Sequence, residues 1–212
     1  MSIKISEIFF SIQGEGPFIG YPTLFIRLYG CNLNCSWCDT PYAKEGEQFF
    51  EKTCDEILNF WIENYPNIPY ITLTGGEPLL QEKSLDLMKA LLKKGALVNL
   101  ETNGSISLEK VPKEVFIVMD IKTPSSGMTH FNYYENFKYL NKKDVVKFVI
   151  QDEKDFEWSL DLIEEFSLWS KVCCLFSPVY GVMDPTELAK LILDTKKPIR
   201  FQVQLHKLLS LK

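Results

Sequence analysis

The stretch TLFIRLYGCNLNCSWC, residues 23–38, joins an apolar run to three closely spaced cysteines. Residues 23–29 are rich in β-branched and aromatic side chains, and such a run predicts a strand. Outward from it, similar runs predict six more strands, at residues 70–74, 97–101, 115–121, 145–150, 172–176 and 199–203. Their nearly continuous apolar character is typical of strands that a parallel sheet buries on both faces.

Helix signals fill the segments between these strands. Residues 53–56 (TCDE) have the pattern of a capping box and predict a helix through residue 65. Asp184 followed by Pro185 predicts another helix start. Further helices are predicted at residues 85–94, 130–140 and 153–169, with a short helical piece around Leu108. This alternation predicts an α/β fold, either an open or partial barrel or a doubly wound sheet, with its site at the carboxyl ends of the strands.

The composition is that of an ordinary globular chain. The 212 residues are 46% hydrophobic and 24% charged, which fits a single domain over residues 1–212. A net charge of -5 argues against a nucleic-acid partner, because such proteins carry a concentrated basic face. No apolar run is long enough to span a bilayer, and the first residues lack the pattern of a signal peptide. A cytoplasmic protein with no membrane partner is expected.

Three of the six cysteines, Cys31, Cys35 and Cys38, form a C-x3-C-x2-C loop. Soft, anionic thiolates suit iron–sulfur clusters, and three of them can hold three irons of a cubane while the fourth iron stays open. A structural zinc site needs a fourth ligand, for which Cys54 is the nearby candidate, in a predicted helical turn. A Cys35–Cys38 redox pair is the other alternative, although it would not need Cys31. The remaining pair, Cys173 and Cys174, falls within a predicted strand and is interpreted as core.

Polar motifs follow four of the predicted strands. They are residues 74–78 (TGGEP), 101–104 (ETNG), 120–122 (DIK) and 177–180 (SPVY). Paired glycines let a backbone approach a ligand closely, and the carboxylate of Glu77 can pair with an ammonium group. Taken alone, GGEP is a turn more often than a ligand site, ETNG and DIK are equally compatible with polar strand ends, and SPVY is the weaker candidate.

The C-x3-C-x2-C loop with Trp37 before its last cysteine, followed one strand later by GGEP, resembles the radical S-adenosylmethionine (SAM) superfamily. The resemblance implies a partial (incomplete) TIM-like barrel of parallel strands, a [4Fe–4S] cluster held by Cys31, Cys35 and Cys38, and SAM bound to the open iron. In that superfamily the aromatic position lies near the SAM adenine and the GGEP element holds the SAM amino group. The SAM contacts implied or made plausible by position are Trp37, Cys38, Asp39, Gly76, Glu77, Asp120, Ile121, Lys122, Ser177 and Pro178.

A further set of motifs spans nearly the whole chain. It comprises residues 11–17 (SIQGEGP), Arg27, the Cys38-Asp39-Thr40 end of the cysteine loop, residues 122–127 (KTPSSG) and residues 204–207 (QLHK). The set resembles the 7-carboxy-7-deazaguanine synthase family of queuosine-precursor biosynthesis, whose short-loop members share the C-x3-C-x2-C spacing. The resemblance implies a lyase that contracts the ring of 6-carboxy-5,6,7,8-tetrahydropterin and releases ammonia, with SAM acting as a regenerated cofactor.

The same resemblance implies a role for several residues and partners. Thr40 would be the protein ligand of a Mg2+ ion, and Arg27 would bind the substrate carboxylate through its paired donors. The other substrate contacts would come from Ile12, Gln13, Gly14, Glu15, Thr74, His206 and Lys212. No catalytic side chain is expected beyond the cluster and SAM. A homodimer and a reductant such as a flavodoxin or ferredoxin are also expected.

Two other functions are weighed against this interpretation. A glycyl-radical-enzyme activating enzyme shares the cluster, SAM and small size, but it does not need the Q-G-E-G segment. A metal-stabilised binding or electron-transfer module leaves GGEP and the polar strand ends without a use. The sequence therefore favours a radical SAM enzyme that acts on a pterin.

Overall fold

The computed structural model describes residues 2–44 and 48–211, and a nine-stranded sheet organises them. The strand order is β3-β1-β2-β4-β5-β6-β7-β8-β9. The strands are β1 (Ile3–Ile12), β2 (Pro22–Leu28), β3 (Phe50–Lys52), β4 (Tyr70–Gly75), β5 (Leu97–Thr102), β6 (Phe116–Ile121), β7 (Val145–Ile150), β8 (Cys173–Pro178) and β9 (Arg200–Phe201).

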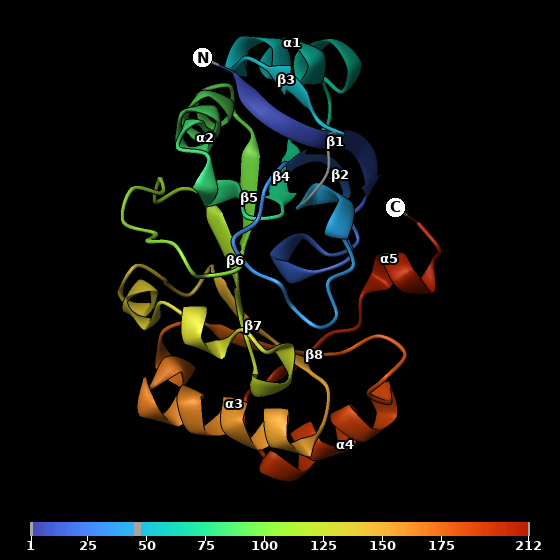
Figure 1. Cartoon of the computed structure of the whole chain (residues 1–212), viewed down its shortest axis with the longest axis vertical. Coiled ribbons are helices and arrows are strands. Elements are labelled where there is room, and N and C mark those ends of the chain that lie inside the picture. Colours follow the sequence, from blue (N-terminus) through green and yellow to red (C-terminus); the bar gives the residue numbers. More distant parts are fainter. Residues whose placement is uncertain (1, 45–47, 212) are drawn as a thin grey trace.

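Helices lie between most successive strands, and one short helix follows the last strand. The α-helices are α1 (Cys54–Asn64), α2 (Lys83–Lys93), α3 (Glu153–Glu165), α4 (Pro185–Thr195) and α5 (Leu205–Leu208). The 3-10 helices are η1 (Gly16–Phe18), η2 (Pro41–Ala43), η3 (Pro78–Leu80), η4 (Pro124–Ser126), η5 (Thr129–Phe131), η6 (Tyr134–Lys138) and η7 (Leu168–Ser170). Figure 1 shows α1 and α2 together at one end of the molecule and α3 and α4 at the other, with the strands between them.

From β2 to β9 all neighbouring strands are parallel, as their apolar sequences predict. The side chains on one face of these strands join the large core, in which Leu73, Leu100 and Phe148 are fully buried. The other face carries a small separate cluster of Val118, Val145 and Leu175 and the residues that line the cavities described below. Among the described residues the end strands β3 and β9 do not pair with each other, so the sheet is a partial barrel. A barrel of parallel strands brings all of its carboxyl ends to one rim, where the site is expected.

Two strands were not predicted, and both are antiparallel. β1 pairs with β2, and β3 pairs with the start of β1. β1 ends beside Pro22 at the start of β2, so the 11–17 motif begins at the amino ends of the parallel strands and reaches mid-strand residues such as Thr72. The apolar runs therefore indicate the parallel part of the sheet and not its antiparallel edge.

The helix starts follow the predicted capping chemistry. Thr53 Oγ1 accepts a hydrogen bond from the Glu56 backbone N–H at 3.3 Å, and Glu56 Oε2 accepts one from the Thr53 N–H at 2.7 Å. Asp184 caps α4 by accepting from the N–H groups of Thr186 and Glu187. Both capping predictions are confirmed.

The helix predicted at residues 130–140 is wrong, because two asparagine side chains bind neighbouring loops instead. Asn132 exchanges two 2.9 Å hydrogen bonds with the backbone of Lys122. Asn136 donates to the carbonyls of Gly104 and Ile106 and accepts from the Leu108 N–H. These bonds hold η5 and η6 as short 3-10 turns, and turns likewise replace the helical piece predicted around Leu108.

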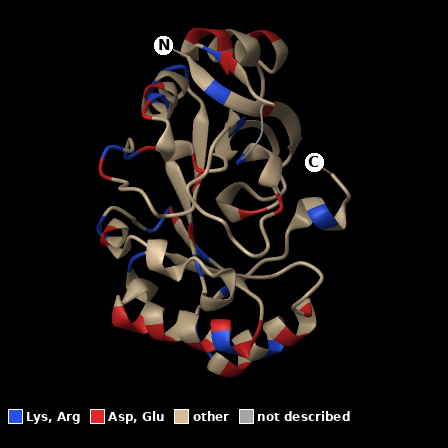
Figure 2. Ribbon diagram, in the orientation of Figure 1, with Lys and Arg blue, Asp and Glu red and all other residues tan. Residues whose placement is uncertain are grey.

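No helix in the described part of the chain is both long enough and apolar enough to cross a membrane. Charged residues crowd the outer helices, and a smaller group lies on strands in the middle of the molecule (Figure 2). That inner group belongs to the site.

Candidate active site

Two cavities adjoin each other: the first lies at the carboxyl rim of the sheet, and the second extends from it toward the end of β1. The first is lined by Cys31, Cys35 and Cys38 together with residues that follow β4, β5 and β6. The second is lined by the end of β1, by Arg27 on β2 and by the C-terminal segment. Asp39 and Glu101 line both cavities, so one continuous hollow joins the cysteine loop to the 11–17 motif.

The cysteine loop is held from two sides. On one side the Ser36 N–H donates to the Ser126 carbonyl at 3.2 Å, and Ser36 Oγ donates to the same carbonyl. On the other side the Glu77 N–H donates to the Gly30 carbonyl at 2.8 Å. The loops after β2, β4 and β6 are thus fixed to one another through backbone groups, which gives the thiols a defined place at the rim.

All six cysteines are free thiols, and three of them line the first cavity. Within residues 2–44 and 48–211, no group of three His, Cys, Asp or Glu side chains converges closely enough to hold a single metal ion. A cubane cluster presents a separate iron to each thiolate, so its ligands need not converge on one point. Three thiols facing one cavity therefore fit a cluster better than they fit a zinc ion.

The carboxylate of Glu77 has a different place from the one predicted. The side chain is fully buried and is absent from the described residues that line the two cavities. It accepts hydrogen bonds from the N–H groups of Leu79 and Asn103, at 3.0 and 2.7 Å, and from the Thr102 hydroxyl. Glu77 therefore ties the β4 loop to the end of β5, and the backbone of Gly75 and Gly76 faces the cavity instead.

The other predicted SAM contacts divide into two groups. Those that line the first cavity are Trp37, Cys38, Asp39, Gly76, Asp120 and Lys122. Ile121, Ser177 and Pro178 do not line it; all three are buried, and Ile121 belongs to the core. Side chains alternate along a strand, so neighbours face the cavity at these strand ends: Val179 and Tyr180 of the 177–180 motif, and Val149, which belongs to none of the motifs.

The predicted substrate residues, apart from Lys212, gather in the second cavity. Ile12, Gln13, Gly14, Glu15, Arg27, Thr74 and His206 all line it. Lys212 lies outside the described residues. Residues from the two ends of the sequence therefore meet at one wall, although nothing in their spacing indicates it.

The side chain of Gln13 is already engaged within the protein. Its Nε2 donates to Thr72 Oγ1 at 3.0 Å and to Glu101 Oε1 at 3.1 Å, and its Oε1 accepts from the Glu15 N–H at 3.2 Å. The amide is 2% exposed, so it fixes the 13–15 turn more than it presents groups to the cavity.

Arg27 and Thr40 lie on the side of the cavity next to β1. Arg27 Nε donates to Glu7 Oε1 at 2.8 Å, and the guanidinium lies over the Phe9 ring at 5.6 Å from its centroid. Arg27 thus has a structural acid and also lines the second cavity. Thr40 directly precedes η2 and lines both cavities, where its hydroxyl is available to a hard cation.

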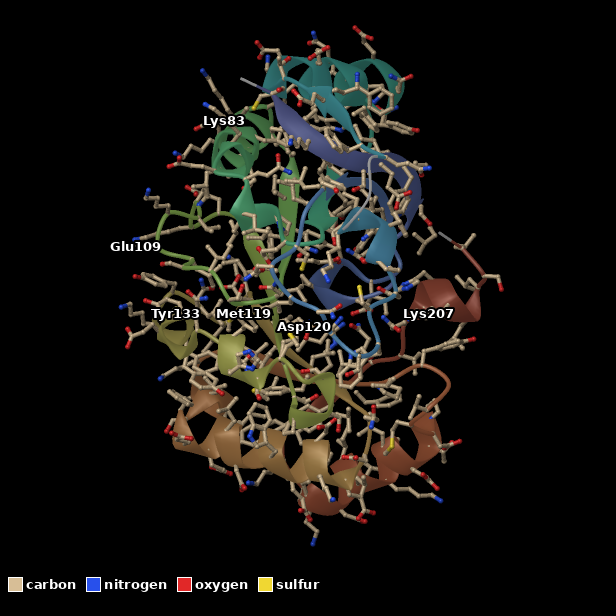
Figure 3. All side chains as sticks on the ribbon, in the orientation of Figure 1. Lys83, Glu109, Met119, Asp120, Tyr133 and Lys207 are labelled. Carbon is tan, nitrogen blue, oxygen red and sulfur yellow. The ribbon has the colours of Figure 1, made fainter. Side chains whose placement is uncertain are left out.

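The C-terminal segment closes over the 11–17 motif. The Leu205 N–H donates to the Gly14 carbonyl at 3.2 Å, and the Gly16 N–H donates to Gln202 Oε1 at 2.7 Å. Lys207 Nζ pairs with Asp39 Oδ2 at 3.1 Å, which ties α5 to the cysteine loop. Figure 3 shows Asp120 near the middle of the molecule and Lys207 on α5, toward the right of the view.

Gly14 has no room for a side chain at this junction. A Cβ at Gly14 would lie 2.2 Å from Nδ1 of His206 and 3.0 Å from the His206 backbone nitrogen. The absence of a side chain at Gly14 is therefore what allows His206 to pack on the 13–15 turn.

The pKa values of two carboxyl groups that line the second cavity, Glu15 and Glu101, are shifted in opposite directions. Burial alone would raise the pKa of Glu15, but Lys147 outweighs it, helped by a hydrogen bond from Gln204, and the pKa is lowered. Burial and the nearby charge of Glu15 raise the pKa of Glu101. Such a divided pair is typical of active sites, where one carboxylate stays ionised and the other carries a proton more readily.

Comparisons with known proteins agree with this geometry. The sequence profile of the radical SAM superfamily matches residues 25–179. A 7-carboxy-7-deazaguanine synthase from Clostridium acetobutylicum is 41% identical over 99% of this chain and 96% of its own length. One from Thermoplasma acidophilum is 37% identical over 97% and 96%.

The fold has solved counterparts. The crystal structure of QueE from Escherichia coli superposes with a TM-score of 0.83 over 97% of this chain and 95% of that one, at 22% identity. Streptococcus suis SuiB bound to S-adenosylmethionine superposes with a TM-score of 0.55 over 82% of this chain and 48% of that one, at 14% identity. Together with the sequence matches, the shared fold and the paired cavities lead to one assignment: this chain belongs to the radical SAM superfamily and, within it, to the 7-carboxy-7-deazaguanine synthase family.

Proposed function

We propose that this chain converts 6-carboxy-5,6,7,8-tetrahydropterin to 7-carboxy-7-deazaguanine with loss of ammonia. The observation that carries the proposal is the joined pair of cavities, one lined by three cysteine thiols and the other by Arg27 and the 11–17 motif. The relatives that match over nearly their whole length bear the name of this reaction.

Cys31, Cys35 and Cys38 would hold a [4Fe–4S] cluster in the first cavity, and SAM would bind beside it. When bound, this pair supplies a 5′-deoxyadenosyl radical for hydrogen abstraction. The backbone of Gly75 and Gly76 would accept the SAM ammonium, and Asp120 and Lys122 would offer opposite charges to its polar groups. Trp37, Val149, Val179 and Tyr180 give the same cavity the apolar surface that an adenine requires.

The second cavity would bind the pterin. Arg27 would pair with the substrate carboxylate, because a guanidinium offers two parallel donors to two oxygens. Glu15 would accept the N–H groups of the aminopyrimidinone edge, and the backbone at residues 12–14 would complete that edge. Glu101, whose carboxyl group carries a proton more readily than usual, lies where it can donate that proton inside the cavity.

Thr40 would be the protein ligand of a Mg2+ ion that also binds substrate oxygens. Magnesium usually keeps several waters and takes few protein ligands, so one hydroxyl at the junction of the two cavities suits it. The proposal therefore includes a dependence of turnover on Mg2+.

The remaining parts of the proposal concern the whole molecule. One sheet with one main core supports a single domain. Free thiols and an iron–sulfur cluster suit a reducing compartment, which supports a cytoplasmic location. A homodimer and an electron donor of the flavodoxin or ferredoxin type complete the proposal, and analytical ultracentrifugation and reduction kinetics test them.

The decisive experiment is anaerobic reconstitution with iron and sulfide, followed by dithionite, SAM and 6-carboxytetrahydropterin, with products identified by mass spectrometry. The proposal expects 7-carboxy-7-deazaguanine and ammonia, with slower turnover when Mg2+ is omitted. Deoxyadenosine without pterin turnover would retain the superfamily and reject the substrate. A confirmed cluster with no SAM cleavage would reject the enzyme.

A further inference from the structure

Lys147 lies at the junction of the two cavities, and none of the sequence motifs includes it. It sits in the middle of β7, opposite Asp120 on β6. Its side chain is 12% exposed and lines both cavities. A lysine in the apolar run VVKFVI is unusual for a strand buried on both faces, which was the signal available in the sequence.

The ammonium group of Lys147 joins carboxylates that belong to different walls. Its Nζ forms a short ion pair with Glu15 Oε2, and it lies 3.6 Å from Asp120 Oδ2. Asp120 in turn pairs through Oδ1 with Lys122 Nζ at 3.2 Å. The charges alternate in the order Glu15, Lys147, Asp120, Lys122, and they run from the pterin cavity to the SAM cavity.

Lys147 is the main positive charge that stabilises an ionised Glu15. Groups from three directions face Glu15: Lys147 from β7, Gln204 and His206 from the C-terminal segment, and Glu101 from β5. Glu15 is 8% exposed, so burial opposes its ionisation. Removal of the ammonium would leave Glu15 beside the carboxyl group of Glu101 with little to compensate it, and a buried carboxylate in that position takes up a proton.

We propose that Lys147 is a positioning residue of the pterin site, which fixes the Glu15 carboxylate toward the aminopyrimidinone edge and ties it to Asp120 on the SAM side. The inference rests on the proposed function. Lys147 acts through Glu15, since both oxygens of that carboxylate are fixed within the protein, one by Lys147 and the other by Gln204. An ionised carboxylate accepts both N–H groups of the pterin edge, whereas a protonated one loses an acceptor.

The test measures binding of 6-carboxypterin to the reconstituted enzyme without reductant, by anaerobic calorimetry between pH 5.5 and 7.5. Lys147→Met is expected to bind about tenfold more weakly than the wild type at neutral pH, as expected for a lost charge-assisted hydrogen bond. The ratio of the two dissociation constants is expected to grow as the pH falls, because Glu15 then takes up a proton in the variant. Titration of the ligand itself is common to both proteins and cancels in the ratio. Lys147→Arg, which keeps the charge, is expected to restore most of the affinity, and Lys190→Met, at an exposed site on α4, serves as the control.

A double substitution separates this role from a general effect on folding. Glu15→Gln combined with Lys147→Met removes one negative and one positive charge, so the net charge of the cavity is unchanged. If Lys147 acts through Glu15, the double variant binds 6-carboxypterin within about twofold of Glu15→Gln alone. Losses that multiply, or an Arg variant as weak as the Met variant, would overturn the proposal. A wild type that binds 6-carboxypterin while Lys147→Met binds it equally at every pH would reject the role of Lys147 alone. A wild type that neither binds nor converts the pterin would overturn the proposed function and this inference together.

Discussion

Substitution of Gly76 by alanine is expected to weaken cluster binding while leaving most of the fold intact. Gly76 follows β4 and packs directly against the start of the cysteine loop. A Cβ there would lie 2.2 Å from the Gly30 carbonyl oxygen and 2.7 Å from Cys31 Cβ. Ordinary contact begins at 3.4 Å, so one of the two loops must retreat by about 1.2 Å, the difference between 3.4 and 2.2 Å. Metal–ligand bonds tolerate only about 0.2 Å.

The energetic cost of this clash is moderate, and its effect on the ligand geometry is large. Overpacking of this kind costs about 1–3 kcal/mol of the free energy of unfolding, which a folded domain can tolerate. Displaced ligands or supporting groups weaken metal binding by about 10–100-fold. The assay is the rate of iron loss to a chelator after anaerobic reconstitution, together with the free energy of unfolding from urea titration.

The control is Gly95→Ala, at a position with φ of +89° and no neighbouring atom within 4 Å of the added Cβ. Backbone strain there costs about 1–3 kcal/mol, comparable to the cost of the clash, but it lies away from the cysteines. Gly95→Ala should keep its iron as the wild type does. Equal iron retention by Gly76→Ala and the wild type would refute the steric argument, and so would equal loss in both variants.

Three further predictions concern the loops around the cavities. Glu77→Gln should lower the free energy of unfolding by about 2 kcal/mol in urea titration, because a buried N–H of Leu79 or Asn103 would face an amide N–H instead of an oxygen. Gly14→Ala should weaken 6-carboxypterin binding by about tenfold and leave the iron content unchanged, because the added Cβ displaces His206 and not the cysteine loop. Burial lowers the pKa of His206, so the unfolded chain binds a proton there more readily than the folded chain does, and the wild type loses stability as the pH falls below about 6.5. His206→Gln should therefore lose less free energy of unfolding than the wild type over that pH range, and identical pH profiles would contradict this.

The sequence carried enough information for the parallel part of the sheet and for its capped helices. Continuous apolar runs such as residues 145–150 match β7 from end to end, and the Thr53 and Asp184 caps form as expected. Both signals are local, since they depend on side chains a few residues apart. The helix predicted at 130–140 failed because the partners of Asn132 and Asn136 are distant loops.

At the site, too, local features could be predicted from the sequence and contacts between distant segments could not. Residue type and motif singled out candidate substrate residues that the fold brings around one cavity, and their role in binding stays a prediction. The direction in which each side chain points was not visible in the sequence. The Glu77 carboxylate points inward and accepts a hydrogen bond at the end of β5, and the Gln13 amide donates hydrogen bonds to Thr72 and Glu101. The role of Lys147 depends on strand register, which pairs it with Asp120 on the neighbouring strand β6 and which the sequence alone does not give.

The contact between the C-terminal segment and the 11–17 motif has a consequence for biosynthesis. Gly16 and Gln202 are separated by 186 positions, yet they share a hydrogen bond. A domain generally folds as a unit, so the second cavity gains the wall that includes Gln204 and His206 only after nearly the whole chain has been made. Ligand binding at this cavity therefore requires that the last segment to be synthesised has docked on one of the first.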